Sequence, residues 1–259
     1  VKIVSKKIKD TFEYEAQFRF YEELNDFLPH NKVKKIFPYK FNGSPSIKDP
    51  IEAIGIPHTE VDLIIVNGRS VSFRYRLKNR DFVSVYPVFQ SIDISPLLKL
   101  RDKPFCKDAF ILDVHLGRLA KTLRMLGFDT VYRNDYDDTE IVKISLQEKR
   151  IIVTRDRKLL HAKEVTHGYC VRSTNPQMQL HEVVKRFNLK MNIRSFSRCM
   201  ICNGLINRVD KDTILHRLEP KTKLHFHEFY RCDVCERIYW KGSHYSELQA
   251  RFERIQSEM

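Results

Sequence analysis

The chain has 259 residues, of which 42% are hydrophobic, with a formal charge of +13 and a pI near 9.4. This length suits one large domain or two to three small ones, and the apolar content is enough for buried cores. No apolar run approaches the roughly 18 residues of a membrane-spanning helix, and the polar amino terminus does not have the apolar core of a secretory signal. We therefore expect a cytoplasmic protein with no membrane association.

The basic excess is largest in the middle of the chain. Residues 97–190 hold 19 Lys and Arg against 12 Asp and Glu. The same segment contains the cluster Asp135, Asp137, Asp138 and Glu140. Acids inside a basic surround suit a polyanionic substrate that is attracted by charge and met by metal ions. A solvated basic surface with no role in nucleic-acid binding is the alternative.

Residues 1–92 predict a small α/β domain. Strands are expected at 16–20, 61–66, 70–73 and 82–85, and helical segments at 22–27 and 49–54. Gly55 ends the second helical segment, and Asn67-Gly68 predicts a tight hairpin turn. His58 precedes a strand, and we interpret it as a histidine with ordinary hydrogen bonds.

The runs IEAIGIPHTEVDLIIVNG at 51–68 and DFVSVYPVF at 81–89 resemble a ubiquitin-like β-grasp domain of the sulfur-carrier type. Such carriers act through a carboxy-terminal diglycine, whereas this chain continues with Gln90-Ser91. Sulfur transfer is therefore disfavoured, and we interpret the domain as a binding or positioning module with a protein partner. Residues 93–107, which contain Pro96 and Pro104, are predicted to be a linker.

Residues 108–190 alternate between strand and helix patterns. Strands are expected at 110–112, 130–132, 151–153 and 169–171, and helices at 115–126, at 138–148 with Asp138 or Thr139 as the N-cap, at 159–165, and after Asn175-Pro176. This alternation predicts a mainly parallel sheet with helices on both faces. Ligands of such sheets bind at the carboxyl ends of the strands.

Acids stand at those positions. Asp113 and Asp156 each follow an apolar strand, and Asp138 stands at the head of a helix. Carboxylates converging from separate elements suit Mg²⁺ or Mn²⁺ and phosphodiester cleavage. Asp135 and Glu140 are further candidates. Asp138 is explained equally well as a helix N-cap, and Asp156 as an ion-pair partner of a neighbouring arginine, whereas a buried Asp113 needs a partner.

The runs LDVHLGRLAKTLRMLGFDTVYRNDYDD at 112–138 and RIIVTRDRKLL at 150–160 resemble the PIN-like ribonuclease domain at the carboxyl end of mut-seven type exonucleases. The resemblance implies RNA cleavage that depends on Mg²⁺ or Mn²⁺. By motif it assigns Asp113, Asp138 and Asp156 as the catalytic acids. The β-grasp domain ahead fits the same arrangement.

Arginines near these acids are candidates for holding RNA phosphates, because a guanidinium binds phosphate with two parallel hydrogen bonds. The candidates are Arg118, Arg124, Arg155 and Arg157. Arg118 and Arg124, which we place on the surface of the helix at 115–126, are explained equally well as a solvated helix face. Arg155 and Arg157 flank Asp156, which favours a site role for at least one of them.

The carboxy-terminal segment, residues 191–259, predicts a zinc ribbon. Two Cys-x-x-Cys pairs, separated by 29 residues, present Cys199, Cys202, Cys232 and Cys235. Four thiolates complete the tetrahedral shell of a structural Zn²⁺. The remaining cysteines, Cys106 and Cys170, stand beside apolar residues and are interpreted as buried thiols.

The zinc ribbon also mixes cations with aromatic residues: Arg208, Arg217, Lys221, Lys223, Tyr230, Tyr239 and Trp240. Such a mixture suits single-stranded RNA, although the same rings suit the core of the ribbon. The sequence as a whole predicts a metal-dependent ribonuclease with RNA as its partner. The alternative is a non-catalytic RNA-binding adaptor in which the acids are structural.

Overall fold

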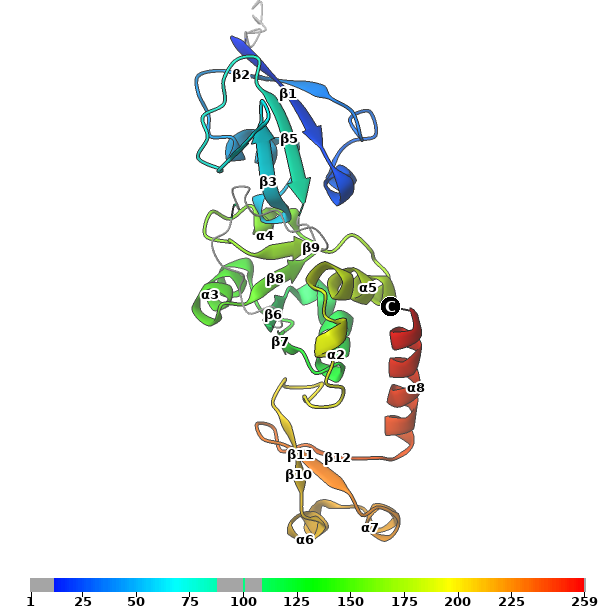
Figure 1. The fold of residues 1–259 in the computed structure, drawn as a ribbon. Coiled ribbons are helices and arrows are strands. Elements are labelled where there is room, and N and C mark those ends of the chain that lie inside the picture. The colour runs from blue at the N-terminus through cyan, green and yellow to red at the C-terminus, as the bar shows by residue number, and fades with distance from the viewer. Residues whose placement is uncertain (1–11, 88–99, 101–108, 259) are drawn as a thin grey trace, which may run out of the picture. The chain divides into compact units, whose positions relative to one another are not determined.

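The computed structural model describes residues 12–87, 100 and 109–258, which fall into two compact units, one within residues 1–103 and one within residues 104–259 (Figure 1). The predicted linker, residues 93–107, lies outside the described residues apart from Leu100, and Cys106 lies outside them as well. Each unit holds a sheet and buried hydrophobic residues of its own.

The amino-terminal unit is built on a five-stranded mixed sheet. Its elements are β1 (Tyr14–Phe20), η1 (Glu22–Phe27), β2 (Phe37–Phe41), α1 (Lys48–Ile54), η2 (His58–Glu60), β3 (Val61–Val66), β4 (Arg69–Val71) and β5 (Phe82–Pro87). The strands follow the order β2-β1-β5-β3-β4, with β1 and β5 parallel and the other neighbours antiparallel. This order confirms the predicted β-grasp fold.

Local chemistry explains the turns of this unit. Gly55 ends α1 at φ 108°, and Asn67 and Gly68 both have positive φ in the hairpin between β3 and β4. Asparagine and glycine tolerate that conformation better than other residues. A ring nitrogen of His58 lies 2.6 Å from the Glu52 carboxylate, so this buried histidine has a local partner, as predicted.

The second unit contains a four-stranded parallel sheet, as predicted (Figure 1). Its strands are β6 (Ala109–Leu112), β7 (Asp129–Val131), β8 (Ile151–Thr154) and β9 (Gly168–Cys170), in the order β7-β6-β8-β9. Every neighbouring pair is parallel. Cys170 is buried, as predicted.

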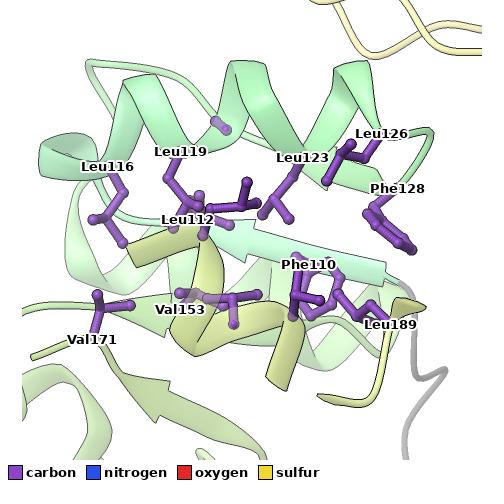
Figure 2. Packing of buried hydrophobic residues seen from close by; sticks show 14 of the residues in the cluster. Phe110, Leu112, Leu116, Leu119, Leu123, Leu126, Phe128, Val153, Val171 and Leu189 are labelled. Atoms are coloured by element: carbon purple, nitrogen blue, oxygen red, sulfur yellow. The ribbon is translucent and has the colours of Figure 1, made fainter. Parts of the chain in front are cut away.

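Helices cover both faces of this sheet. On one face, α2 (Gly117–Met125) and α5 (Pro176–Phe187) pack over Phe110, Leu112 and Val153 (Figure 2). Strand side chains alternate between faces, so the buried Ile111 and Ile152 point to the other face, which α3 (Asp138–Glu148) covers. The predicted N-cap of α5 is confirmed, because the Asn175 side chain accepts hydrogen bonds from the backbone N–H groups of Gln177 and Met178.

Two helices begin differently from the prediction. The 3-10 turn η3 (Val114–Leu116) precedes α2, and α4 (Arg157–Leu160) starts earlier and ends sooner than the predicted helix at 159–165. The Asp156 side chain accepts from the Lys158 N–H and caps α4, which fixes the early start.

The carboxy-terminal part of the second unit forms an antiparallel sheet of β10 (Ile206–Val209), β11 (Phe229–Cys232) and β12 (Ile238–Trp240). The other elements are η4 (Lys190–Asn192), α6 (Lys211–Ile214), η5 (Leu215–Arg217), α7 (Pro220–His225) and α8 (Ser243–Glu258). A small core of Ile214, Leu218 and Phe229 supports the sheet. The predicted boundary between residues 190 and 191 falls inside this compact unit.

Gly127 follows α2 at φ 94° and lies against the segment that leads to the zinc ribbon. A Cβ at this position would clash with the backbone carbonyl oxygen of Arg194. Gly68 also has positive φ (80°), but no heavy atom lies within 4 Å of its Cβ position. A side chain at either glycine would be strained by the positive φ, but only at Gly127 would it also clash with the backbone.

We expect Gly127→Ala to lower the free energy of unfolding of the second unit by about 3 kcal/mol or more. Gly68→Ala should cost the amino-terminal unit about 1 kcal/mol, because it adds only backbone strain. Urea unfolding of both variants, followed by circular dichroism, measures the difference. Equal losses would contradict the close packing at Gly127.

Candidate functional site

Asp113 is a buried carboxylate at the carboxyl end of β6. Only 4% of its surface is exposed. Its Oδ1 accepts from the His115 N–H at 2.7 Å, and its Oδ2 accepts from the Arg155 N–H at 3.0 Å and from the Thr154 hydroxyl. These donors compensate for the burial of the charge and fix the orientation of the carboxylate.

Thr154 joins two of the predicted acids. Its hydroxyl donates to Asp113 and accepts from the Asp156 N–H at 2.8 Å. Asp156 is exposed at the end of β8, and its Oδ1 accepts from the Lys158 N–H at 2.8 Å. The sequence prediction did not assign a role to Thr154. The signal was a fully buried hydroxyl at the last position of an otherwise apolar strand, which needs a polar partner.

Asp138 is the first residue of α3 and does not cap it. Asp137 is the N-cap: its Oδ1 accepts from the Glu140 N–H at 2.8 Å, and the Glu140 side chain accepts from the Asp137 N–H at 3.2 Å. The prediction that Asp138 or Thr139 caps this helix is therefore wrong. A capping box satisfies both helix-end donors and leaves Asp138 available for another role.

The pKa of Asp138 is raised by burial, then by the negative charges of Asp156, Asp113 and Asp137. Asp113 and Asp156 therefore both lie within electrostatic range of Asp138. Like charges in one place disfavour ionisation unless a cation compensates for them.

The two further candidate acids are held elsewhere. Asp135 forms an exposed ion pair with Arg133 at 2.6 Å, and the hydrogen bond from Arg133 lowers its pKa. Glu140 is committed to the capping box with Asp137. The structure therefore gives each of these acids a partner within the chain.

The four candidate arginines divide into two groups. Arg118, Arg155 and Arg157 are exposed, and Arg155 and Arg157 flank Asp156. Arg124 is only 4% exposed, so the prediction that it lies on the surface and contacts RNA is wrong. Thr122, on the same helix, is buried as well.

The Arg124 guanidinium is engaged by backbone carbonyl groups of the protein itself. Its Nε donates to Thr130 at 2.8 Å, and its Nη1 donates to Met200 at 3.2 Å and to Ile201 at 2.7 Å. Burial lowers the pKa of Arg124. The side chain thus connects α2 and β7 to the first Cys-x-x-Cys turn. The N–H groups that make these hydrogen bonds are directed at the protein itself and not at an outside ligand.

The four predicted zinc ligands come together. The Sγ atoms of Cys199, Cys202, Cys232 and Cys235 all lie within 4.8 Å of one another. The Sγ atoms of Cys199 and Cys235 are 3.6 Å apart, and those of Cys202 and Cys232 are 3.3 Å apart. Tetrahedral thiolates with Zn–S bonds of about 2.3 Å would stand about 3.8 Å apart, so the cluster fits a metal ion.

Burial opposes ionisation of the Cys199 thiol, but hydrogen bonds from the Tyr239 hydroxyl and from backbone N–H groups outweigh it and lower the pKa of Cys199 to about 7. Burial raises the pKa of Cys202 and of Cys235. Metal binding requires all four thiols to ionise, and a bound cation would supply the compensating charge.

Over residues 12–87, 100 and 109–258, the four cysteines are the one group of three or more His, Cys, Asp or Glu side chains close enough to share an ion. Asp113 and Asp156 raise the pKa of Asp138, but the three aspartates do not form such a group. No helix in the same part of the chain has the length and apolar character that a membrane crossing requires.

Comparison with known families gave two matches. Residues 13–93 match the Mut7-C ubiquitin family, and residues 108–252 match the Mut7-C RNAse domain family. Searches of curated proteins and of solved structures gave no match. The second match spans more than half of the 259 residues. The chain therefore belongs to the Mut7-C RNAse domain family, which gives it a nuclease-type role, and it carries a ubiquitin-like domain ahead of the nuclease domain.

Proposed function

We propose that this protein is a ribonuclease that cleaves RNA phosphodiester bonds with Mg²⁺ or Mn²⁺ held by Asp113, Asp138 and Asp156. One observation carries the proposal: burial and then the nearby charges of Asp156 and Asp113 raise the pKa of Asp138, so these three acids from separate elements lie near one another. A cluster of acids in the most basic third of the chain is suited to binding a cation next to a polyanion.

The residues fit a hard divalent ion. Mg²⁺ keeps several waters and is commonly held by one or two carboxylates together with substrate phosphates, so a closed protein shell is unnecessary. When bound, such an ion supplies a water of lowered pKa and stabilises the leaving oxygen. Asp138 is free of capping, and the Asp113 carboxylate is fixed in orientation by its hydrogen bonds to Thr154 and Arg155.

The exposed arginines complete the proposal. Arg118 is in the first turn of α2, shortly after Asp113, while Arg155 and Arg157 flank Asp156. A guanidinium holds a phosphate oxygen with directed hydrogen bonds and neutralises its charge. We assign these three side chains to binding the RNA backbone.

Purified wild-type protein should cleave single-stranded RNA with Mn²⁺ or Mg²⁺ and lose the activity in excess chelator. Asp113→Asn should lower the cleavage rate by about 100-fold or more, because it removes a charge that directly faces the ion. Asp135→Asn is the matched control and should cleave normally, since Asp135 is paired with Arg133. Equal cleavage by wild type and Asp113→Asn would reject the site and favour the non-catalytic adaptor.

Replacement by alanine should affect stability at Asp137 and cleavage at Asp138. Asp137→Ala removes the N-cap of α3 and should cost about 1 kcal/mol of unfolding free energy while cleavage persists. Asp138→Ala should abolish cleavage and leave stability nearly unchanged, because Asp138 accepts no capping hydrogen bond. Thermal unfolding and cleavage assays on the two variants test this, and loss of activity in Asp137→Ala alone would reverse the assignment.

We further propose that the four cysteines hold a structural Zn²⁺. The core of the ribbon is small, so metal binding would supply much of its folding energy, about 10 kcal/mol or more in isolated zinc modules. Elemental analysis should find about one zinc per chain, and Cys199→Ser should lose it and unfold the ribbon. Cys170→Ala, a buried thiol outside the cluster, should keep the zinc. Full zinc content in Cys199→Ser would contradict this ligand set.

A further inference from the structure

A pocket of about 540 Å³ lies between the sheet of the zinc ribbon, residues 195–200 and the start of α8. None of the candidate acids lines it. Its volume lies within the range of small-molecule and nucleotide sites.

Aromatic rings dominate the walls. Tyr230 and Tyr239 are directly paired across β11 and β12, so their side chains stand on the same face of the sheet. Phe196 and Tyr245 form a second ring pair, with centroids 4.8 Å apart and planes 44° apart. The rings come from three separate segments, and all four line the one pocket.

One ring is held in place by the metal cluster. The Tyr239 hydroxyl lies 2.9 Å from the Cys199 sulfur, and the ring is only partly exposed. A fixed orientation lowers the entropy that a stacked ligand would otherwise lose on binding.

Three cations border the rings. Arg198 is engaged by Asp129 and by the Asn203 carbonyl group, and Lys241 pairs with Glu228 at 3.2 Å. Arg237 is exposed and forms no ion pair with any residue in the described parts of the chain. A pocket lined by aromatic rings, with the Arg237 guanidinium beside it, is complementary to a ligand that has a planar ring and a negatively charged group.

We propose that this pocket binds an unpaired nucleobase of single-stranded RNA, with the base against Tyr230 and Tyr239 and the adjacent phosphate at Arg237. Every base has a π-face, so the site would tolerate different sequences. This inference rests on the proposed function for the identity of its ligand, and it gives the ribbon a binding role beyond its metal. The pocket holds the substrate and takes no part in the cleavage step.

Binding is measured with a short single-stranded 2′-O-methyl oligoribonucleotide in the Asp113→Asn background, so that no cleavage occurs. Trp240 is the only tryptophan and also borders the pocket, so its fluorescence reports occupancy. Tyr230→Leu should weaken binding by about 5- to 100-fold, whereas Tyr230→Phe should keep it. Tyr14→Leu, a similarly exposed ring in the other unit, should have no effect.

A second pair of variants separates the pocket from general charge. Arg237→Gln should weaken binding more than Arg231→Gln, which removes an equal exposed charge on β11 outside the pocket. Equal small losses in both would mean attraction by net charge alone and would overturn the proposal. Equal binding of a base-free polyphosphate would overturn it too.

Zinc content confirms that each variant is folded. If Tyr230→Leu loses zinc, its weaker binding reflects unfolding and is not used. Binding by Arg237→Gln and by Tyr230→Phe then tests the pocket. The two proposals fail separately: unchanged cleavage by Asp113→Asn would reject the catalytic site while leaving this titration valid. Unaltered binding by Tyr230→Leu and Arg237→Gln would reject the pocket while leaving the cleavage result valid.

Discussion

The buried guanidinium of Arg124 joins the parallel sheet of the second unit to the zinc ribbon. Taking a cation out of water costs several kcal/mol, and the cost is recovered only if its donors meet acceptors. Here the acceptors are carbonyl groups of β7 and of the first Cys-x-x-Cys turn. Asn203 adds a second link, since its side chain donates to Asp129 at 2.7 Å and accepts from the Thr130 N–H at 2.9 Å. The zinc ribbon is thereby held to the parallel sheet by polar contacts that cannot slip without leaving a buried charge without its acceptors.

Because of this link, α2 connects the acids to the zinc ribbon in addition to covering the sheet. The helix starts shortly after Asp113, at the carboxyl edge of the sheet, and its last turn carries Arg124 to the zinc ribbon. Its nine residues span about 14 Å at 1.5 Å per residue. The helix therefore acts as a spacer between the acids and the ribbon. An RNA bound at both proposed sites would have to bridge this separation, so it would be longer than a single nucleotide.

Sequence patterns predicted the features that depend on local order. The parallel sheet follows from periodicity and the grouping of Cys199, Cys202, Cys232 and Cys235 from spacing, whereas the β-grasp fold was implied by a family resemblance. Arg124 was misplaced because its partners Met200 and Ile201 lie 76 and 77 residues away, beyond any local pattern. The N-cap error was avoidable, since Asp137 followed three residues later by Glu140 is a capping box in the sequence itself. The threonine that orders the acids left only a weak signal, a polar residue at the end of an apolar strand.

The adjacent residues Asp137 and Asp138 show how the chain separates structure from chemistry. The Asp137 carboxylate accepts a hydrogen bond from the Glu140 N–H and caps the helix. Asp138 caps no helix, and burial, followed by the charges of Asp156, Asp113 and Asp137, raises its pKa. Acidification would protonate such a group at a higher pH than an ordinary aspartate, whereas a divalent ion would relieve the same repulsion and lower the pKa again. The capping box therefore satisfies the helix end with one acid and leaves the neighbouring carboxylate outside the cap, where the proposed metal site needs it.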